Sequence, residues 1–400
     1  MKLNLNFYNS LGLKNEEKKL NKKINKIFSQ LIDETKNQKK TLNLLNNKYK
    51  FNFKISEFKK FRKFKTIAVI GMGGSILGAE AIYNFLEFKI KKKVYFFNNL
   101  DENKIIDFKN KENLSKVLFI IISKSGYTIE TITNTFLMKI VKKNSKNLII
   151  ISEKNNSFLH SLAKKFNLFY VEHKKTIGGR YSVLSEVGIV PAYLMGINIK
   201  KLRANIRYWL KGSNKTFLKK SAIKLSKFMN SSKYTSLILL NYSPQLEKFL
   251  YWCQQLIAES LGKKGKGFLP IVSAAPKDHH SLLQLYLDGP KNKIYTIFSD
   301  INNSLEKIKI EKKIDSKNFL QNKTLKEIVS AQKRALIKTL KNKKIPFREF
   351  TILKNNEEVL GLLFSYFILE TIAIGKLSNI DPFSQPAVEE VKKYTKKLLI

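Results

Sequence analysis

Short apolar runs alternate with stretches of helical spacing from residue 61 onward. The first series of runs lies at 66–70, 93–97, 117–122, 147–152 and 169–172. Most positions within each run are hydrophobic, which is typical of strands covered on both faces. The alternation of these runs with helical segments predicts βαβ units and a parallel sheet.

A second series of runs repeats the pattern after helical segments at about 200–230. Its expected strands lie at 236–240, 268–272, 293–298 and 346–353. We therefore predict an α/β fold of two doubly wound αβα sandwich domains with mostly parallel sheets, joined by helices near 180–230. The expected regions are an N-terminal helical layer at 1–60, a first α/β domain at 61–200, a second α/β domain with connecting helices at 201–378, and a C-terminal helix region at 379–400.

Both ends of the chain show helical spacing. Near the N-terminus, Leu20, Ile24, Ile27 and Leu31 fall on one helix face. Two helices are expected at the other end, at 357–377 and 386–398, separated by N-I-D-P-F-S-Q-P. The apolar part of the first, at 359–374, contains Glu370 and is shorter than a membrane span, so we expect a buried core helix and no membrane partner.

The charge of the chain is unusual, whereas its hydrophobic content is ordinary. The 400 residues are 43% hydrophobic, which is enough for a substantial core, but the formal net charge is +44. The lysines are spread from end to end and form no basic stripe with interleaved aromatic residues. We therefore favour a compositional bias at surface positions over a nucleic-acid function, and expect the positive surface to attract phosphorylated substrates.

Cysteine usage and the N-terminal segment bear on the cellular compartment. Cys253 is the single cysteine, so an internal disulfide is excluded and a reducing compartment is favoured. The opening segment M-K-L-N-L-N-F-Y-N-S contains no apolar run of the kind found in signal peptides. We expect a cytoplasmic protein.

A glycine-rich turn follows the first expected strand, in the segment T-I-A-V-I-G-M-G-G-S-I-L-G. It is not a good dinucleotide fingerprint, because Ile76 stands where the third glycine should fall and Asn98 replaces the acidic residue after the next strand. Gly74 and Ser75 still allow close approach of a ligand to a helix N-terminus. A tight turn without a ligand explains this segment equally well.

A cluster of hydroxyl groups follows the third expected strand, in S-K-S-G-Y-T-I-E-T at 123–131. Ser123, Lys124, Ser125 and Thr128 would supply the O–H and N–H donors and the limited positive charge that a phosphate monoester requires. Helix capping alone would account for one of these hydroxyls but not for four polar groups. Since no nucleoside triphosphate loop motif is present, the sequence indicates a small phosphorylated metabolite.

Six segments together resemble the glucose-6-phosphate isomerase family in their order and approximate spacing. They are G-M-G-G-S (71–75), S-K-S-G-Y-T-I-E-T (123–131), G-G-R-Y-S (178–182), A-E-S-L-G-K (258–263), D-H-H-S-L-L-Q (278–284) and S-Q-P-A-V-E-E-V-K (384–392). The resemblance covers about 65–400 and implies two SIS-type domains. It also implies interconversion of glucose 6-phosphate and fructose 6-phosphate in glycolysis and gluconeogenesis, through a cis-enediol and without metal or cofactor.

The resemblance implies a role for each matching residue. Glu259 is the expected base for proton transfer between C2 and C1, since isomerisation through an enediol needs one carboxylate. Arg180 would stabilise the enediolate. His280, selected over His279 because it precedes Ser281, would open the sugar ring and would reach the active site of a neighbouring subunit. A homodimer is therefore expected.

The remaining family residues are assigned to the C-terminal segment and the two loops. Lys392 matches the last catalytic lysine and Gln385 a phosphate contact. Ala387 and Val391 depart from the family pattern, so Lys393 remains an alternative to Lys392. The other substrate contacts expected from the resemblance are Gly74, Ser75, Ser123, Lys124, Ser125 and Thr128.

Two other hypotheses remain open from the sequence. An isomerase of the same fold could act on another sugar phosphate, such as mannose 6-phosphate, because hydroxyl loops cannot separate sugars that differ at one carbon. A non-catalytic sugar-phosphate sensor or an RNA-binding protein would suit the positive charge. Neither of these binding proteins would need Glu259, Arg180, His280 and Lys392 together, so the isomerase is favoured.

Overall fold

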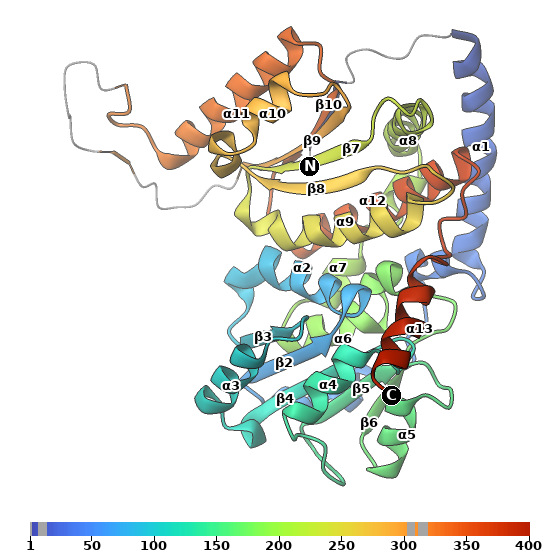
Figure 1. The fold of residues 1–400 in the computed structure, drawn as a ribbon, viewed down its shortest axis with the longest axis vertical. Coiled ribbons are helices and arrows are strands. Elements are labelled where there is room, and N and C mark those ends of the chain that lie inside the picture. Colours follow the sequence, from blue (N-terminus) through green and yellow to red (C-terminus); the bar gives the residue numbers. More distant parts are fainter. Residues whose placement is uncertain (1, 7–13, 302–308, 311–318) are drawn as a thin grey trace.

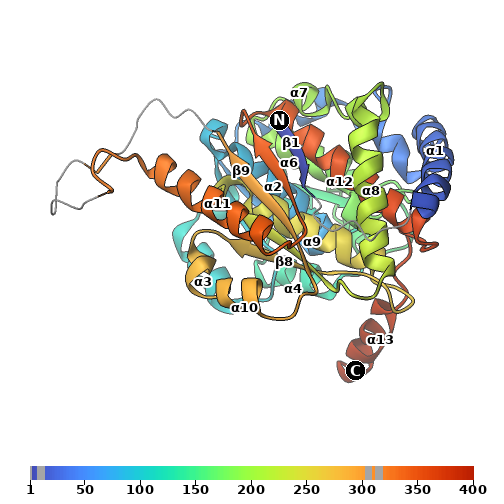
Figure 2. The same cartoon turned by 90° about the horizontal axis from the view of Figure 1, so that it is seen from above.

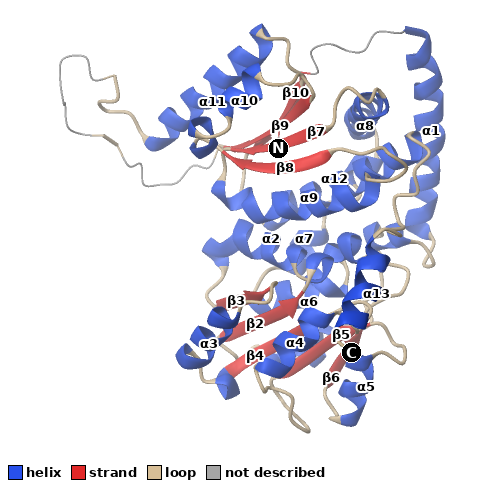
Figure 3. Ribbon diagram, viewed as in Figure 1, coloured by secondary structure: helices blue, strands red, loops and turns tan. Residues whose placement is uncertain are grey.

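Two α/β layers are stacked with helices between them (Figures 1 and 3). The computed structural model describes residues 2–6, 14–301, 309–310 and 319–400. Each layer has a five-stranded sheet. These sheets confirm the predicted α/β class with mostly parallel strands.

The first sheet is entirely parallel and has the strand order β3-β2-β4-β5-β6. Its strands are β2 (Thr66–Gly71), β3 (Lys93–Phe97), β4 (Val117–Ile122), β5 (Leu148–Ser152) and β6 (Phe169–Glu172). Every residue of β4 is buried, which explains its unbroken apolar sequence. The helices of this layer are α2 (Leu77–Leu86), α3 (Glu102–Lys111), α4 (Ile129–Leu137), α5 (Phe158–Lys165) and α6 (Glu186–Met195).

The second sheet has the order β1-β10-β9-β7-β8 and is parallel except for β1. Its strands are β1 (Lys2–Asn6), β7 (Ser236–Asn241), β8 (Leu269–Ala274), β9 (Lys293–Asp300) and β10 (Phe347–Ile352). The remaining helices are α1 (Lys14–Lys36), α7 (Ile199–Arg203), α8 (Asn214–Asn230), α9 (Glu247–Leu261), α10 (Leu283–Asp288), α11 (Leu325–Asn342), α12 (Glu357–Leu377) and α13 (Val388–Leu398).

The prediction of an N-terminal helical layer is incomplete. Residues Lys2–Asn6 form an edge strand antiparallel to β10 instead of a helix. The helical part is α1, which is joined to the end of α12 by an ion pair of 2.6 Å between Lys376 and Glu34. Further along, Tyr49 donates a hydrogen bond of 2.8 Å to the buried Glu186 and so fastens this region to the first layer. The expected domain boundaries at 60, 200 and 378 remain predictions.

The largest buried cluster joins the two layers. It includes Val69 of the first sheet, Leu239 of the second, and residues of α9 and α12, which lie between the sheets (Figure 3). By length and composition α12 could cross a membrane, but 89% of its most apolar window is buried inside the protein. The expectation of a buried core helix at this position is confirmed.

Candidate active site

Both candidate ligand loops leave the first sheet at the point where its strand order reverses. The chain runs from β2 to the edge strand β3 and then returns to β4 on the other side of β2. Gly71, at the end of β2, pairs with Ile122, at the end of β4. The glycine turn and the hydroxyl loop therefore begin side by side at the carboxyl edge, where open α/β sheets bind ligands.

The hydroxyl loop is ordered by its own side chains. The Ser123 and Thr128 hydroxyls are 2.8 Å apart, and Ser123 also accepts a hydrogen bond of 3.2 Å from the Gly126 amide. The Ser125 hydroxyl accepts one of 3.2 Å from the Tyr127 amide. Ser123 is buried, whereas Ser125 is exposed and Thr128 is half-buried. Ser123 thus fixes the shape of the loop, while Ser125 and Thr128 are accessible to a ligand.

Lys124 is paired with protein groups and not with a neighbouring hydroxyl. Its Nζ lies 3.4 Å from a Glu153 carboxylate oxygen and 3.1 Å from the Lys175 carbonyl oxygen. The structure therefore places Lys124 at the edge of the loop. Its predicted contact with a phosphate remains a prediction.

The glycine turn fits tightly against two other parts of the chain. A Cβ on Gly74 would overlap the backbone of Gly179, and one on Gly73 would lie 2.7 Å from the Gln255 Nε2. Gly73 also has a φ of +51°, which side-chain-bearing residues rarely adopt. The turn therefore packs against the segment that carries Arg180 and against α9. Ser75, which follows, is buried at 9% exposure.

Arg180 connects the elements of the site. It is only 3% exposed, and all five of its N–H groups have partners. These partners are Ser260 Oγ (2.8 Å from Nε), Glu259 Oε2 (3.3 Å from Nη1), Gln385 Oε1 (2.6 Å from Nη1), the Pro382 carbonyl (2.7 Å from Nη2) and the Ser384 carbonyl (3.2 Å from Nη2). One guanidinium thus joins α9 to the segment leading to α13.

Glu259 lies in the last turn of α9 and is held on both carboxylate oxygens. Oε2 faces Arg180, and Oε1 accepts a hydrogen bond of 2.8 Å from Gln255 Nε2. The Glu259 side chain is 31% exposed, so the carboxylate is accessible as well as oriented. Gln255 is not among the site residues predicted from the sequence. The sequence feature that could have indicated it is its position four residues before Glu259, because residues at this spacing lie on one helix face.

The Ser260 and Tyr181 hydroxyls form a chain of hydrogen bonds that begins at Arg180. Ser260 accepts from Arg180 Nε and is 2.8 Å from the Tyr181 hydroxyl, which donates to the Pro382 carbonyl at 2.7 Å. Because the Tyr181 proton goes to Pro382, Tyr181 accepts from Ser260. Tyr181 and Ser260 are likewise not among the predicted site residues, although each is adjacent in sequence to one of them, Arg180 and Glu259.

Lys392 and His280 are not brought to Glu259 within the chain. Lys392 lies on α13, which has no buried residue and projects from the body in Figure 2. On that helix Lys392 forms an ion pair of 2.7 Å with Glu389. Gln254, in the middle of α9, donates to the Pro270 carbonyl at the start of β8, whereas the exposed His280 follows the end of β8. A strand of this length spans on the order of 20 Å. Gln385, by contrast, does reach Arg180.

No metal cluster is found within the described ranges of the chain, where no three His, Cys, Asp or Glu side chains are grouped to hold an ion. The polar groups of Arg180 and the Glu259 carboxylate are held by other residues of the site. What the geometry offers is an oriented, accessible carboxylate beside a guanidinium, next to the glycine turn and to the hydroxyl loop with its accessible donors. Such an arrangement suits proton transfer on a small anionic substrate.

The sequence model of the family described as Phosphoglucose isomerase matches residues 20–399. This chain belongs to the phosphoglucose isomerase family. Among its relatives in that family, the probable glucose-6-phosphate isomerase of Methanococcus maripaludis is 33% identical, over 90% of this chain and 83% of the relative. The glucose-6-phosphate isomerase of Methanocaldococcus jannaschii is also 33% identical, over 86% of this chain and 87% of the relative.

Solved structures agree with the phosphoglucose isomerase assignment at the level of the fold. A protein of Thermus thermophilus described as hypothetical has a TM-score of 0.85 at 22% identity, covering 100% of this chain and 99% of that one. A glucose-6-phosphate isomerase from Chlamydia trachomatis has a TM-score of 0.72 at 19% identity, covering 86% and 71%.

Proposed function

We propose that the protein reversibly interconverts D-glucose 6-phosphate and D-fructose 6-phosphate through a cis-enediol, as an aldose–ketose isomerase of glycolysis and gluconeogenesis. The observation that carries this proposal is the position of Glu259. Its carboxylate is oriented by Arg180 and Gln255 next to the glycine turn, which shares a sheet edge with the hydroxyl loop.

The phosphate of the substrate binds the loops of the first sheet. Ser125 and Thr128 offer hydroxyls, the N-terminus of α4 offers backbone N–H groups, and Ser75 lies on the adjacent turn. Ser123 holds the loop in shape through Thr128. The high positive charge of the chain favours encounter with the anionic sugar phosphate.

Glu259 moves the proton between C2 and C1 of the open-chain sugar. One carboxylate suffices for both directions, because the proton that it removes from one carbon is returned to the other. Arg180 lies 3.3 Å from this carboxylate and supplies the positive charge that the enediolate oxygen requires. Gln255 keeps the other carboxylate oxygen in place.

Ring opening is assigned to His280 of a second copy of the chain, which makes the protein a homodimer. Within one chain His280 follows the far end of β8 from Glu259, yet its side chain is exposed and accessible to a neighbour. Lys392, or Lys393 in the other register, is assigned as the second catalytic group; it lies on the exposed α13, which follows Gln385, and Gln385 contacts Arg180. The buried, free Cys253 is in keeping with a cytoplasmic location.

A coupled assay of fructose 6-phosphate conversion tests the activity and the base. Wild type should turn over, and Glu259→Gln should lower kcat by about 10³-fold or more, since general base catalysis contributes about 10²–10⁴-fold. Glu247→Gln, at the first residue of the same helix, is the matched control and should leave kcat unchanged. Absence of turnover by wild type would refute the activity, and unchanged turnover by Glu259→Gln would refute the base.

Mixing two inactive variants tests the shared site. In a mixed dimer of Glu259→Gln and His280→Ala chains, one site would contain both substitutions and the other site neither. Activity should therefore return on mixing after dissociation and reassembly. If His280 served the site of its own chain, each site would retain one substitution and the mixture would stay inactive.

A further inference from the structure

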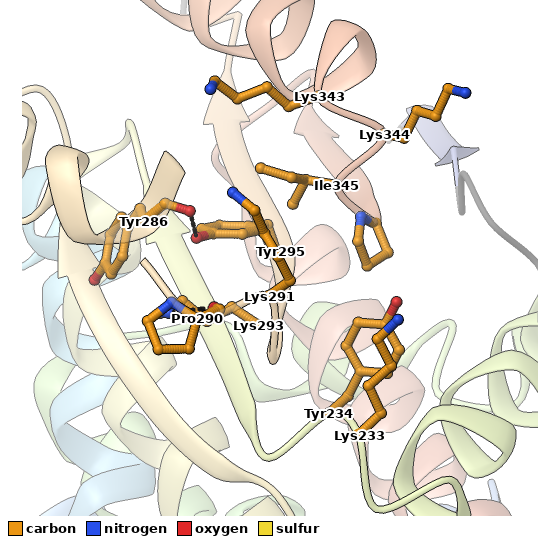
Figure 4. A pocket seen from close by; sticks show the side chains of 11 residues that line it. Lys233, Tyr234, Tyr286, Pro290, Lys291, Lys293, Tyr295, Lys343, Lys344 and Ile345 are labelled. Atoms are coloured by element: carbon orange, nitrogen blue, oxygen red, sulfur yellow. Dashed lines mark hydrogen bonds between the residues drawn. The ribbon is translucent and has the colours of Figure 1, made fainter. Parts of the chain in front are cut away.

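A second concave site lies on the outer face of the second sheet, away from α9 and α12. It has a volume of about 200 Å³ at the amino ends of β7, β9 and β10, and Tyr286, Tyr295 and Ile345 belong to the outer hydrophobic cluster (Figure 4). The residues that line it are Lys233, Tyr234, Tyr286, Pro290, Lys291, Lys293, Tyr295, Lys343, Lys344, Ile345 and Pro346. None of them belongs to the candidate active site.

The lining of this pocket carries charge of one sign. Five of its eleven residues are lysines, and no lining residue is Asp or Glu. Lysines are abundant throughout the chain, so their number alone would mean little. The distinctive feature is that all five line one hollow whose lining has no carboxylate, since like charges around a cavity repel one another until an anion enters.

The Lys291 and Lys293 ammonium groups each have at least one N–H group without a hydrogen-bond acceptor among the residues that the structure describes. Lys291 Nζ donates to the Leu287 carbonyl at 2.8 Å, and Lys293 Nζ donates to the Pro290 carbonyl at 2.8 Å and to Asn292 Oδ1 at 3.2 Å. An ammonium has three N–H groups, so at least one remains on each lysine. Partial burial and the nearby Lys291 lower the pKa of Lys293, which is the crowding of positive charge that a bound anion would relieve.

Tyr234 provides a neutral donor at the pocket. The residue as a whole is 6% exposed, its hydroxyl is not among the buried atoms of the described residues that lack a partner, and Tyr234 is one of the residues that line the pocket. Burial raises its pKa, so the hydroxyl stays protonated near neutral pH. In Figure 4 this hydroxyl and the Lys233 ammonium point in the same direction, towards the side of the pocket on which Ile345 lies. A protonated hydroxyl can donate a hydrogen bond to an anion.

We propose that this pocket is a binding site for a small multivalent oxyanion of the polyphosphate class. Lysines from separate segments and Tyr234 line it, and no lining residue carries an opposing charge. Its volume is below the roughly 300 Å³ at which drug-sized ligand pockets begin, so the occupant is closer in size to pyrophosphate than to a nucleotide. The site lies apart from the proposed isomerase site and does not depend on that activity.

Calorimetric titration of the full chain with inorganic pyrophosphate at fixed ionic strength tests this site. The double variant Lys233→Gln/Lys293→Gln should weaken one class of binding sites by about tenfold or more, because hydrogen bonds to charged groups are among the stronger ones. Lys39→Gln/Lys40→Gln removes the same charge from exposed positions elsewhere and should titrate like wild type. Equal weakening in both variants, or none in the pocket variant, would overturn the proposal.

Tyr234→Phe keeps the aromatic ring and provides a second test that does not depend on tolerance of the double substitution. Loss of the hydroxyl should weaken pyrophosphate binding by about fivefold, with the thermal unfolding midpoint of the free protein unchanged or raised. Binding identical to that of wild type would contradict the assignment of Tyr234 as a donor.

Discussion

The two α/β layers share an architecture but use their sheet edges differently. In the first layer the strand order reverses between β2 and β4, and both candidate ligand loops emerge there. In the second layer it reverses between β7 and β9, where the Ser243 hydroxyl donates to the Asp300 carboxylate. The second layer instead contributes Glu259 from the far end of α9. The site is thus formed where the two layers pack against each other, and within the described residues the second sheet does not provide a ligand-binding edge like that of the first.

A similar contrast exists between two arginine–glutamate pairs. Arg348 and Glu370 lie 2.6 Å apart inside the second layer, and neither side chain is more than 3% exposed. Arg180 and Glu259 lie 3.3 Å apart between the layers, with Glu259 31% exposed. The first pair is sealed in the core, where Tyr366 also donates to Glu370, while the second is open on one side. We expect the sealed pair to govern stability and the open pair to govern chemistry.

Breaking the sealed pair should have the largest effect on stability. Glu370→Gln leaves the Arg348 charge buried without its counter-ion, and loss of one partner of a buried pair costs about 3–5 kcal/mol. Urea unfolding should show that loss, with kcat per folded molecule unchanged. Glu389→Gln, which breaks the exposed pair with Lys392, should change the unfolding free energy by less than about 0.5 kcal/mol. Equal effects of the two variants would contradict the contrast.

The next effect concerns pH and the first layer. Burial lowers the pKa of His173 to about 4, and the nearby Lys124 charge adds to this. Between about pH 6.5 and 4 the unfolded chain binds a proton that the folded chain does not, so falling pH destabilises the fold, by about 3 kcal/mol over the whole window. Chemical denaturation at pH 7, 6 and 5 should show this slope in wild type.

In His173→Gln that slope should be shallower by about 1 kcal/mol per pH unit. Above pH 7 the two proteins should follow parallel curves, because neither the folded nor the unfolded state binds this proton there. Identical slopes below pH 6.5 would show that His173 titrates alike in both states.

Removal of one hydroxyl between the layers should have a smaller effect on catalysis. Tyr181→Phe ends the chain of hydrogen bonds from Arg180 through Ser260 to Pro382. A buried hydrogen bond of this kind contributes about 1 kcal/mol, so kcat should fall by about fivefold to tenfold with little change in KM. A rise in KM at constant kcat would place Tyr181 in substrate binding instead of in positioning Arg180.

The smallest effect is expected at the loop of the first layer. Thr128→Val retains the shape of the side chain but removes a hydroxyl that faces Ser123 and the expected phosphate. KM for fructose 6-phosphate should rise severalfold, while kcat should stay within about twofold. A fall in kcat as large as that of Glu259→Gln would contradict the division between a binding layer and a catalytic helix.

Much of the fold could be predicted because its signals are local. All nine predicted strands are present, since continuous apolar runs mark strands buried on both faces. The loops after β2 and β4 were also found from glycine and hydroxyl residues at strand ends. By contrast, β1 is a short polar strand, K-L-N-L-N, whose identity depends on pairing with β10 more than 340 positions away.

The site could be predicted only in part, because its partnerships join distant segments. Arg180 and Glu259 were identified, but their link to Pro382 and Gln385 arises from packing of the C-terminal segment. The roles of Gln255 and Ser260 could not be predicted, because they depend on which face of α9 packs against Arg180. Nothing in the spacing of residues indicated that His280 would lie at the opposite end of β8.

Solvent deuterium incorporation tests directly whether Glu259 transfers a proton through an enediol. Fructose 6-phosphate is converted in D₂O, and deuterium at C2 of the glucose 6-phosphate product is measured by NMR. A carboxylate at 31% exposure should exchange its proton with solvent during some turnovers, so deuterium should appear at C2. Full turnover by wild type with no deuterium at C2 would contradict proton transfer by Glu259.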